Sequence, residues 1–373
     1  MKSGLFSEIL SECDRFARKE IDTCALEADL SGDKNTARRL WETSRELDLP
    51  LLLIPETYGG AGMALMSGGL VLDRLAGACA GFASVLAFHF AACAAASACG
   101  STGSGKWFSF LTGSDCDKTK LSSVCLPPKL EENGLSFYLH NNIPVVSGQS
   151  MFVGNAGLAS SIMVFAFKNG NPDDPAALRI APATTGVEWE PPLLLPGLKL
   201  NSFARLRFEN VPVEADAVLA EGQEAKKLIR AAEHAVYGLI AAVAMGCARK
   251  AHKKAKDYAG QRYQFKQTII YHQEIQRLLG KMAMNLNVGT AGFLDLLDGE
   301  KRRPSFHVPQ ASLVKAFCTD AALDIVADAI QIHGGYGYMH EYGLEKSMRD
   351  AKVLQVLGET NPYLLVRHTA DSL

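Results

Sequence analysis

The spacing of the apolar residues changes twice along the chain, and this change limits the fold more than any other feature. In residues 1–107 and 220–373 apolar residues recur at helical spacing, whereas residues 108–219 contain β-branched and aromatic runs separated by turn clusters. This order predicts an α+β multidomain protein with an all-α N-terminal domain and a middle domain built of β-strands. The helices after residue 220 predict a C-terminal antiparallel four-helix bundle.

Composition and charge narrow the class of protein. A chain of 373 residues with 48% hydrophobic content can bury a large core and would usually divide into two or three domains. A formal net charge of −2 and a pI near 6.5 give no basic surface for nucleic acid or an anionic membrane. We therefore expect a multidomain enzyme that binds neither.

The cysteines and the N-terminus indicate a cytoplasmic location. The nine cysteines form no Cys-x-x-Cys pair and lie mostly in apolar helical contexts, which is typical of buried thiols in a reducing compartment. The N-terminus runs directly into an acidic amphipathic pattern, so we expect no secretory signal. Residues 70–99 form the one run long enough to suggest a membrane span, but Asp73, Arg74, His89 and many small residues favour buried helices.

Three motifs follow one another near the C-terminus. Residues 331–338 read Gln-Ile-His-Gly-Gly-Tyr-Gly-Tyr, residues 349–352 read Arg-Asp-Ala-Lys, and residues 358–361 read Gly-Glu-Thr-Asn. Paired glycines after an apolar helix let the backbone approach a ligand, and Thr360 can cap the next helix while offering N–H groups to an anion. This order resembles the C-terminal end of the acyl-CoA dehydrogenase family, where an Arg-Asp-Ala-Lys helix leads into Tyr-Glu-Gly-Thr.

Further segments carry the same resemblance over nearly the whole chain. Residues 55–62 look like the family's Pro-Glu-x-Tyr-Gly-Gly-x-Gly loop, and residues 208–213 look like its Phe-Glu-Asn-Val-x-Val-Pro strand. Residues 262–265 resemble its Arg-x-x-Phe-Gly turn, followed at the expected distance by His272 and Gln273. The resemblance implies an acyl-CoA dehydrogenase-like α–β–α order with a β-barrel middle domain and a closing C-terminal four-helix bundle. It also implies FAD as cofactor and assembly as a dimer or tetramer.

The resemblance also implies a role for individual residues. Arg262 matches the arginine that reaches the FAD pyrophosphate of a neighbouring subunit, a task that suits a planar guanidinium. Ser147 aligns with a hydroxyl that faces the flavin ring, and Thr360 with a phosphate contact at a helix start. The remaining expected FAD contacts are Phe265, Gln273, Gln331, Gly334 and Gly335.

Two segments depart from the family pattern. The family carries Leu-Thr-Glu-Pro-x-x-Gly-Ser-Asp against the flavin and the thioester, whereas residues 110–115 read Phe-Leu-Thr-Gly-Ser-Asp, as though four residues were deleted. Ser114 of this shortened loop is an expected substrate contact, together with Gly358. Lys266 replaces the glycine of the Arg-x-x-Phe-Gly turn, where a residue free to take positive φ is favoured.

The catalytic base is the central question. Dehydrogenation of an acyl-CoA needs a carboxylate to remove the α-proton while the flavin accepts the β-hydride. In the family this carboxylate commonly precedes Gly-Thr, but here Gly358 holds that position and Glu359 follows it. Other members carry the base on the first helix of the bundle, where the matching residue is Val236; Glu233, nearly one turn earlier, is expected on a solvated helix face. Glu359 is the best available base.

Three functions remain open. The first is an active α,β-dehydrogenase of fatty acid metabolism that passes electrons to an electron-transfer flavoprotein or a similar acceptor. The second is a silent or assisting subunit of a heteromer with a related chain. The third is an acyl-CoA flavoprotein with other chemistry, such as elimination or desulfination. The alternative without catalysis is that Glu359 is a helix-start residue favoured by the helix dipole. The spacing of His333, His340 and Glu341 predicts no metal site.

Overall fold

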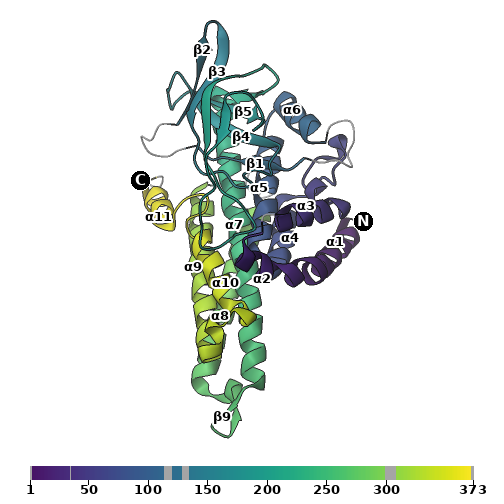
Figure 1. The fold of residues 1–373 in the computed structure, drawn as a ribbon, viewed down its shortest axis with the longest axis vertical. Coiled ribbons are helices and arrows are strands. Elements are labelled where there is room, and N and C mark those ends of the chain that lie inside the picture. Colours follow the sequence, from purple (N-terminus) through teal and green to yellow (C-terminus); the bar gives the residue numbers. More distant parts are fainter. Residues whose placement is uncertain (1, 34, 113–119, 128–133, 299–307, 371–373) are drawn as a thin grey trace.

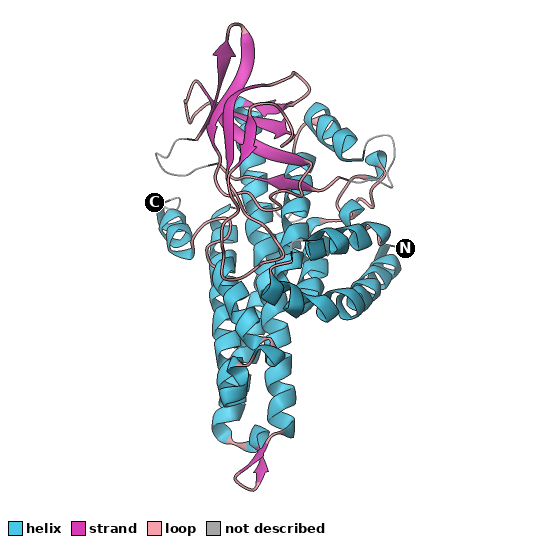
Figure 2. Ribbon diagram, viewed as in Figure 1, coloured by secondary structure: helices cyan, strands magenta, loops and turns pink. Residues whose placement is uncertain are grey.

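The computed structural model describes residues 2–33, 35–112, 120–127, 134–298 and 308–370 (Figure 1). The predicted order of a helical, a strand-rich and a second helical part is confirmed (Figure 2). The strands lie at one end of an elongated molecule, and the long helices of the C-terminal part run toward the other end, where the β9 hairpin lies.

The first helical part packs small helices around an apolar centre. It consists of α1 (Lys2–Phe16), α2 (Asp22–Ser31), α3 (Asn35–Glu46), α4 (Leu65–Ala78), α5 (Ala80–Ser97) and α6 (Ser101–Thr112). Helix α5 is buried on nearly every side, as the apolar run predicted. The expectation of a single membrane-length run was wrong, because α7 (Gly222–Gln261) is also long and apolar enough; the apolar windows of both helices are 89% and 100% buried within the described protein.

The middle part forms one sheet of mixed strand direction. Its strands are β1 (Ser122–Val124), β2 (Leu135–His140), β3 (Ile143–Gln149), β4 (Ser161–Lys168), β5 (Pro175–Ile180), β6 (Val187–Trp189), β7 (Leu206–Pro212) and β8 (Val218–Glu221). The order is β6-β7-β3-β2-β4-β5-β8, with β1 beside β4. Strands β1 and β2 run parallel to β4, and the other pairs are antiparallel. The sheet has its own apolar core, to which Val146, Ile162 and Leu178 contribute.

The C-terminal part is a bundle built on the 40-residue helix α7. Helices α8 (Gln273–Asp298) and α9 (Val308–His333) pack along α7, and α10 (Leu344–Leu354) packs against α9 and α7. A small hairpin, β9 (Tyr263–Gln264) and β10 (Gln267–Thr268), joins α7 to α8, and α11 (Asn361–Ala370) closes on α9.

His89 ties the first helical part to the sheet. It lies on α5 with no exposed surface, and its Nε2–H donates to the Pro50 carbonyl oxygen at 3.0 Å, which leaves Nδ1 as the acceptor for the Ser122 N–H at 3.2 Å and hydroxyl at 2.9 Å. Burial lowers the pKa of His89 to about 4. A neutral imidazole therefore holds β1 in place.

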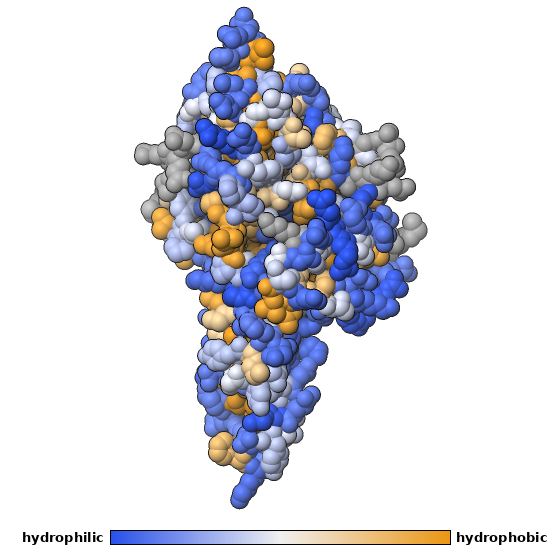
Figure 3. Space-filling model, viewed as in Figure 1, coloured by the Kyte–Doolittle hydropathy of each residue, from blue (hydrophilic) through white to orange (hydrophobic). Residues whose placement is uncertain are grey.

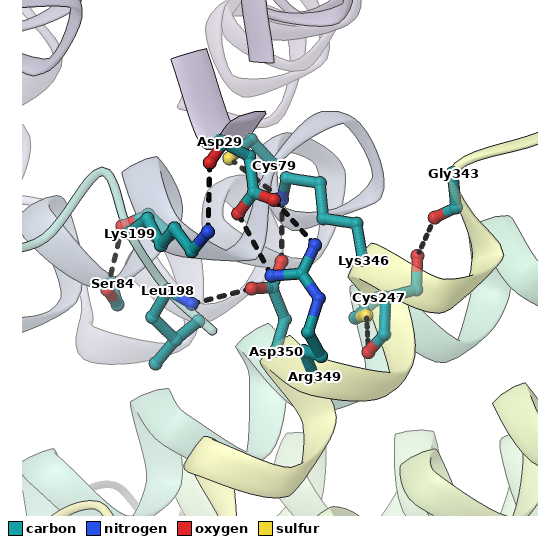
Figure 4. A network of polar contacts seen from close by, with 12 residues as sticks. Asp29, Cys79, Ser84, Leu198, Lys199, Cys247, Gly343, Lys346, Arg349 and Asp350 are labelled. Carbon is teal, nitrogen blue, oxygen red and sulfur yellow. Dashed lines mark hydrogen bonds and ion pairs between the residues drawn. The ribbon is translucent and has the colours of Figure 1, made fainter. Parts of the chain in front are cut away.

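The Arg-Asp-Ala-Lys motif joins all three parts (Figure 4). The Arg349 guanidinium pairs with buried Asp29 of α2 at 2.5 Å and donates to the Pro196 carbonyl oxygen at 2.6 Å. Asp350 accepts the Leu198 N–H and the Lys346 ammonium, both at 2.6 Å. Because Leu198 lies between β6 and β7, the motif fixes the segment that leads into the site described next.

Candidate active site

An apolar cavity of about 350 Å³ lies where the three parts of the chain meet. Its walls come from α5, β1 and the residues after it, the segments after β3 and β6, α7, and the connection between α10 and α11. The lining residues are Phe88, Val124, Leu126, Pro127, Met151, Phe152, Leu193, Leu195, Phe203, Val236, Val353, Val356, Leu357, Gly358, Glu359 and Thr360. A pocket of this composition is typical of a site for a small apolar ligand.

Glu359 supplies the charge in this cavity. Among the lining residues that the structure describes, it is the only one with an ionisable side chain. It is half-buried, and Thr360, with its hydroxyl, follows it at the start of α11. The structure thus brings together Gly358, Glu359 and Thr360 of the predicted site on the wall of a mainly apolar cavity.

Gly358 lies close to helix α7. Its φ of +79° is a left-handed conformation that favours glycine. A Cβ built at this position would lie 3.1 Å from Val236 Cγ1, 3.3 Å from Ile240 Cδ1 and 3.4 Å from Tyr237 Cε1. The two positions at which the family resemblance implies a base are therefore neighbours in space, and here they carry Gly358 and Val236, neither of which can accept a proton.

Lys315 lies beneath the same segment. It has no exposed surface on α9, and its Nζ donates to the carbonyl oxygens of Gln355 at 2.8 Å and Glu359 at 2.6 Å and to Asn361 Oδ1 at 2.8 Å. Burial lowers the pKa of Lys315 to about 7, while the charges of Asp320 and Glu359 raise it. The three oxygen acceptors match the three N–H donors of an ammonium group, which favours the charged form.

The expectation that Glu233 lies on a solvated helix face was wrong. Its side chain has no exposed surface, and both carboxylate oxygens accept hydrogen bonds of 3.1 Å from the Arg367 guanidinium on α11. A buried bidentate pair of this kind fixes α11 against α7. No local sequence pattern indicates this pair, because the two residues are 134 positions apart.

The expected FAD contacts fall into two groups. Arg262, Phe265 and Gln273 lie at the β9 end of the bundle, and Gln331, Gly334 and Gly335 lie at the nearby end of α9. Ser147 belongs to β3, at the opposite end of the long axis, and Thr360 directly precedes α11, which lies near the middle of that axis and well away from β9 (Figure 1). One chain therefore does not bring all eight residues together.

The group at the β9 end has the properties of a phosphate and ring site. The Arg262 guanidinium lies over the Tyr336 ring, 5.8 Å from its centroid, and no carboxylate within the described ranges pairs with it. Phe265 is 86% exposed, and Gly334 has a φ of +59° with open space around it. Lys266 takes the left-handed conformation that the family's glycine would favour, with a φ of +68°. The chemistry of these residues fits part of the site of an extended anionic cofactor.

Ser147 has local partners and does not line the cavity. Its hydroxyl oxygen accepts the Asn210 N–H at 2.9 Å and lies 3.1 Å from the Tyr138 hydroxyl. From this strand region it is the segment after β3 that reaches the cavity, where Met151 and Phe152 are lining residues. No polar motif marks these two residues in the sequence.

Of the shortened loop at residues 110–115, the structure describes residues 110–112. Ser114 lies outside the described residues, whereas Thr112 ends α6 and is buried, its hydroxyl donating to the Phe108 carbonyl oxygen at 3.0 Å. The strand that approaches the cavity is β1, which leads into Leu126 and Pro127. Sequence reasoning missed this segment because its short apolar run carries no distinctive pattern.

His333 packs against the aromatic ring of Tyr258. It is buried, stacks on Tyr258 with ring centroids 4.3 Å apart, and its Nδ1 lies 2.8 Å from the Ala329 carbonyl oxygen. In the described part of the chain, no three His, Cys, Asp or Glu side chains group closely enough to hold a metal ion. The eight described cysteines are free thiols, and all except Cys24 are buried.

Comparison with known proteins identifies the family. The model of the acyl-CoA dehydrogenase N-terminal domain matches residues 7–103, and that of the C-terminal domain matches residues 238–365. The probable acyl-CoA dehydrogenase YngJ of Bacillus subtilis is 28% identical over 368 residues, which cover 91% of this chain and 90% of that protein. Cyclohex-1-ene-1-carbonyl-CoA dehydrogenase of Syntrophus aciditrophicus is 27% identical over 347 residues, or 84% and 78% of the two chains.

A solved structure agrees with these matches over the full length. The butyryl-CoA dehydrogenase of Megasphaera elsdenii has the same fold, with a TM-score of 0.87 at 24% identity over 98% of this chain and 97% of that one. Both family models and a relative of matching length thus agree with the α–β–α architecture. This chain belongs to the acyl-CoA dehydrogenase family, whose members are oxidoreductases that act on CH–CH groups.

Proposed function

We propose that this protein catalyses FAD-dependent α,β-dehydrogenation of an acyl-CoA thioester, with Glu359 as the base that removes the α-proton. The observation that carries this proposal is the position of Glu359, the one ionisable side chain among the described residues that line the apolar cavity. When bound, FAD would accept the β-hydride, and Arg262 with the glycines at the end of α9 would hold its pyrophosphate. The protein's own part is to bind the acyl group, exclude water and receive the proton.

The walls favour an apolar acyl group. The Phe88 and Phe203 rings form an edge-to-face pair with centroids 5.8 Å apart, and Leu193 and Leu195 also line the cavity. No lining residue that the structure describes is basic, so a second carboxylate on the acyl chain would be left without a partner. We therefore propose a compact apolar acyl chain rather than a dicarboxylic one.

We further propose a cytoplasmic dimer or tetramer that passes its electrons to an electron-transfer flavoprotein or a similar acceptor, in fatty acid metabolism. The separation of the two groups of expected FAD contacts supports an assembly of at least two chains. Gly358 and Val236 favour a second function, that of an assisting subunit, because both usual base positions lack a carboxylate. In that case a related chain would supply the base.

The test combines the visible absorption spectrum of the purified protein with anaerobic titration by acyl-CoA esters of different chain length. We expect a bound flavin that is bleached by one class of apolar ester. A Glu359→Gln variant should retain its flavin and lose about 100-fold or more in the rate of bleaching. Glu188→Gln on the exposed face of β6 is the matched control and should leave the rate unchanged.

The other outcomes separate the alternatives. Full activity of Glu359→Gln would remove the base assignment. A flavin that no ester bleaches would argue against dehydrogenation by this chain alone. Bleaching restored only by co-expression with a related chain would establish the assisting subunit.

A further inference from the structure

Lys315 connects three segments around the candidate base. Its first acceptor is the Gln355 carbonyl oxygen, directly after the last turn of α10, and its second is the carbonyl oxygen of Glu359 itself. The third is Asn361 Oδ1, on the first residue of α11. One ammonium group thus joins the end of α10, the base and the start of α11.

The hydrogen bonds around Lys315 extend back into α9. The Asn361 side-chain amide donates to the Ala316 carbonyl oxygen at 3.3 Å, to Thr319 Oγ1 at 2.9 Å and to Asp320 Oδ1 at 2.7 Å. The segment from Gln355 to Asn361 is therefore fastened to one face of α9. The charged groups that act on the ammonium are Asp320 on the same helix and Glu359 in the segment above it.

The connection between α10 and α11 needs such an anchor because of its glycine. Gly358 precedes Glu359 directly and adopts a left-handed conformation that a glycine can also leave easily. Val236 and Ile240 lie beside it, 3.1 and 3.3 Å from the place where a Cβ would stand, and limit its movement toward α7. Lys315 restrains the following residue through the Glu359 carbonyl oxygen.

We infer that Lys315 is a positioning residue whose ammonium group fixes the backbone of Glu359 and thereby the direction in which its carboxylate enters the cavity. The catalytic consequence of this inference rests on the proposed function, whereas the anchoring of the segment does not. Because catalysis is sensitive to displacements of about 1 Å, a released segment would lose about 100-fold in rate without losing the binding site.

The central variant is Lys315→Met, which keeps the length of the side chain and removes all three donors. Its matched control is Lys281→Met, which removes an ammonium paired at 3.0 Å with Asp328 between α8 and α9, away from the cavity. Hydrogen–deuterium exchange of residues 355–361 is the first measurement. We expect at least 10-fold faster exchange in Lys315→Met and no change in Lys281→Met.

The second measurement is the rate of flavin reduction by a saturating acyl-CoA, with the dissociation constant of the ester obtained from the same titration. We expect Lys315→Met to reduce about 100-fold more slowly, with less than a threefold change in the dissociation constant and an unchanged flavin content. Unchanged exchange would overturn the inference. Faster exchange with an unchanged reduction rate would overturn the catalytic part.

Two arrangements keep the test decisive. If Lys315→Met does not fold, Asn361→Ser removes one acceptor and leaves two, and it should show a smaller change in exchange in the same direction; no change would overturn the inference. If the wild-type flavin is not reduced by any ester, the proposed function fails, while the exchange measurement still decides whether Lys315 anchors the segment.

Discussion

Substitution of Gly358 by alanine tests the packing that excludes a base from this position. The left-handed φ of +79° costs a residue with a Cβ about 1 to 2 kcal/mol. The new Cβ would also lie 3.1 Å from Val236 Cγ1 and 3.3 Å from Ile240 Cδ1, which adds about 1 to 2 kcal/mol of crowding. We expect Gly358→Ala to lower the free energy of unfolding by about 2 to 4 kcal/mol.

Gly334→Ala is the control that isolates the backbone contribution. Gly334 has a φ of +59° and nothing within 4 Å of a built Cβ, so its replacement should cost about 1 to 2 kcal/mol. The contribution of crowding is then measured by a double-mutant cycle with Val236→Ala, which removes the closest atom and should recover about 1 kcal/mol in the Gly358→Ala background. Equilibrium urea unfolding at one protein concentration provides the four free energies. Equal losses for the two glycines, with no coupling to Val236, would refute the reasoning.

Three further predictions follow from other contacts. Burial lowers the pKa of His89 from 6.5 to about 4, so only the unfolded chain takes up this proton as the pH falls from 6.5 toward 4. In urea unfolding, the free energy of unfolding of the wild type should fall by about 3 kcal/mol more than that of His89→Gln over this pH range. Equal losses in the two proteins would contradict the buried neutral imidazole. Glu233→Gln should lower the free energy of unfolding by about 2 to 4 kcal/mol in the same assay, because it leaves the Arg367 guanidinium without its buried carboxylate. The double variant Glu233→Leu with Arg367→Leu should recover part of this loss. Arg262→Ala should purify with less flavin absorbance per chain but an unchanged circular dichroism spectrum, since the exposed guanidinium packs on Tyr336; full flavin content would remove its cofactor role.

The fold was predictable from the sequence because long helical and short extended patterns alternate in blocks. The location of single residues was predictable where a motif places them next to one another, as for Gly358, Glu359 and Thr360, which line one cavity. Glu233 could not be placed, because helical spacing alone does not show that Arg367 folds back over it from α11. The cavity walls were missed for a similar reason: they combine single apolar residues from segments far apart in the chain.

The exchanged order of Gly358 and Glu359, compared with the Glu-Gly-Thr order of the family, involves the surrounding packing as well as the missing side chain at residue 358. Val236 and Ile240 lie 3.1 and 3.3 Å from the place where a Cβ on residue 358 would stand, so a glutamate there would need these neighbours to shift by a few tenths of an ångström as well as a different backbone conformation. The packing of α7 and the left-handed glycine therefore depend on each other, and together they leave Glu359 as the carboxylate at the cavity. Lys315 of α9 donates to the Glu359 carbonyl oxygen at 2.6 Å. The position of the proposed base is thus determined jointly by α7, α9 and the segment between α10 and α11, which is why we expect that a glutamate placed at residue 358 alone does not restore the geometry that the family resemblance implies.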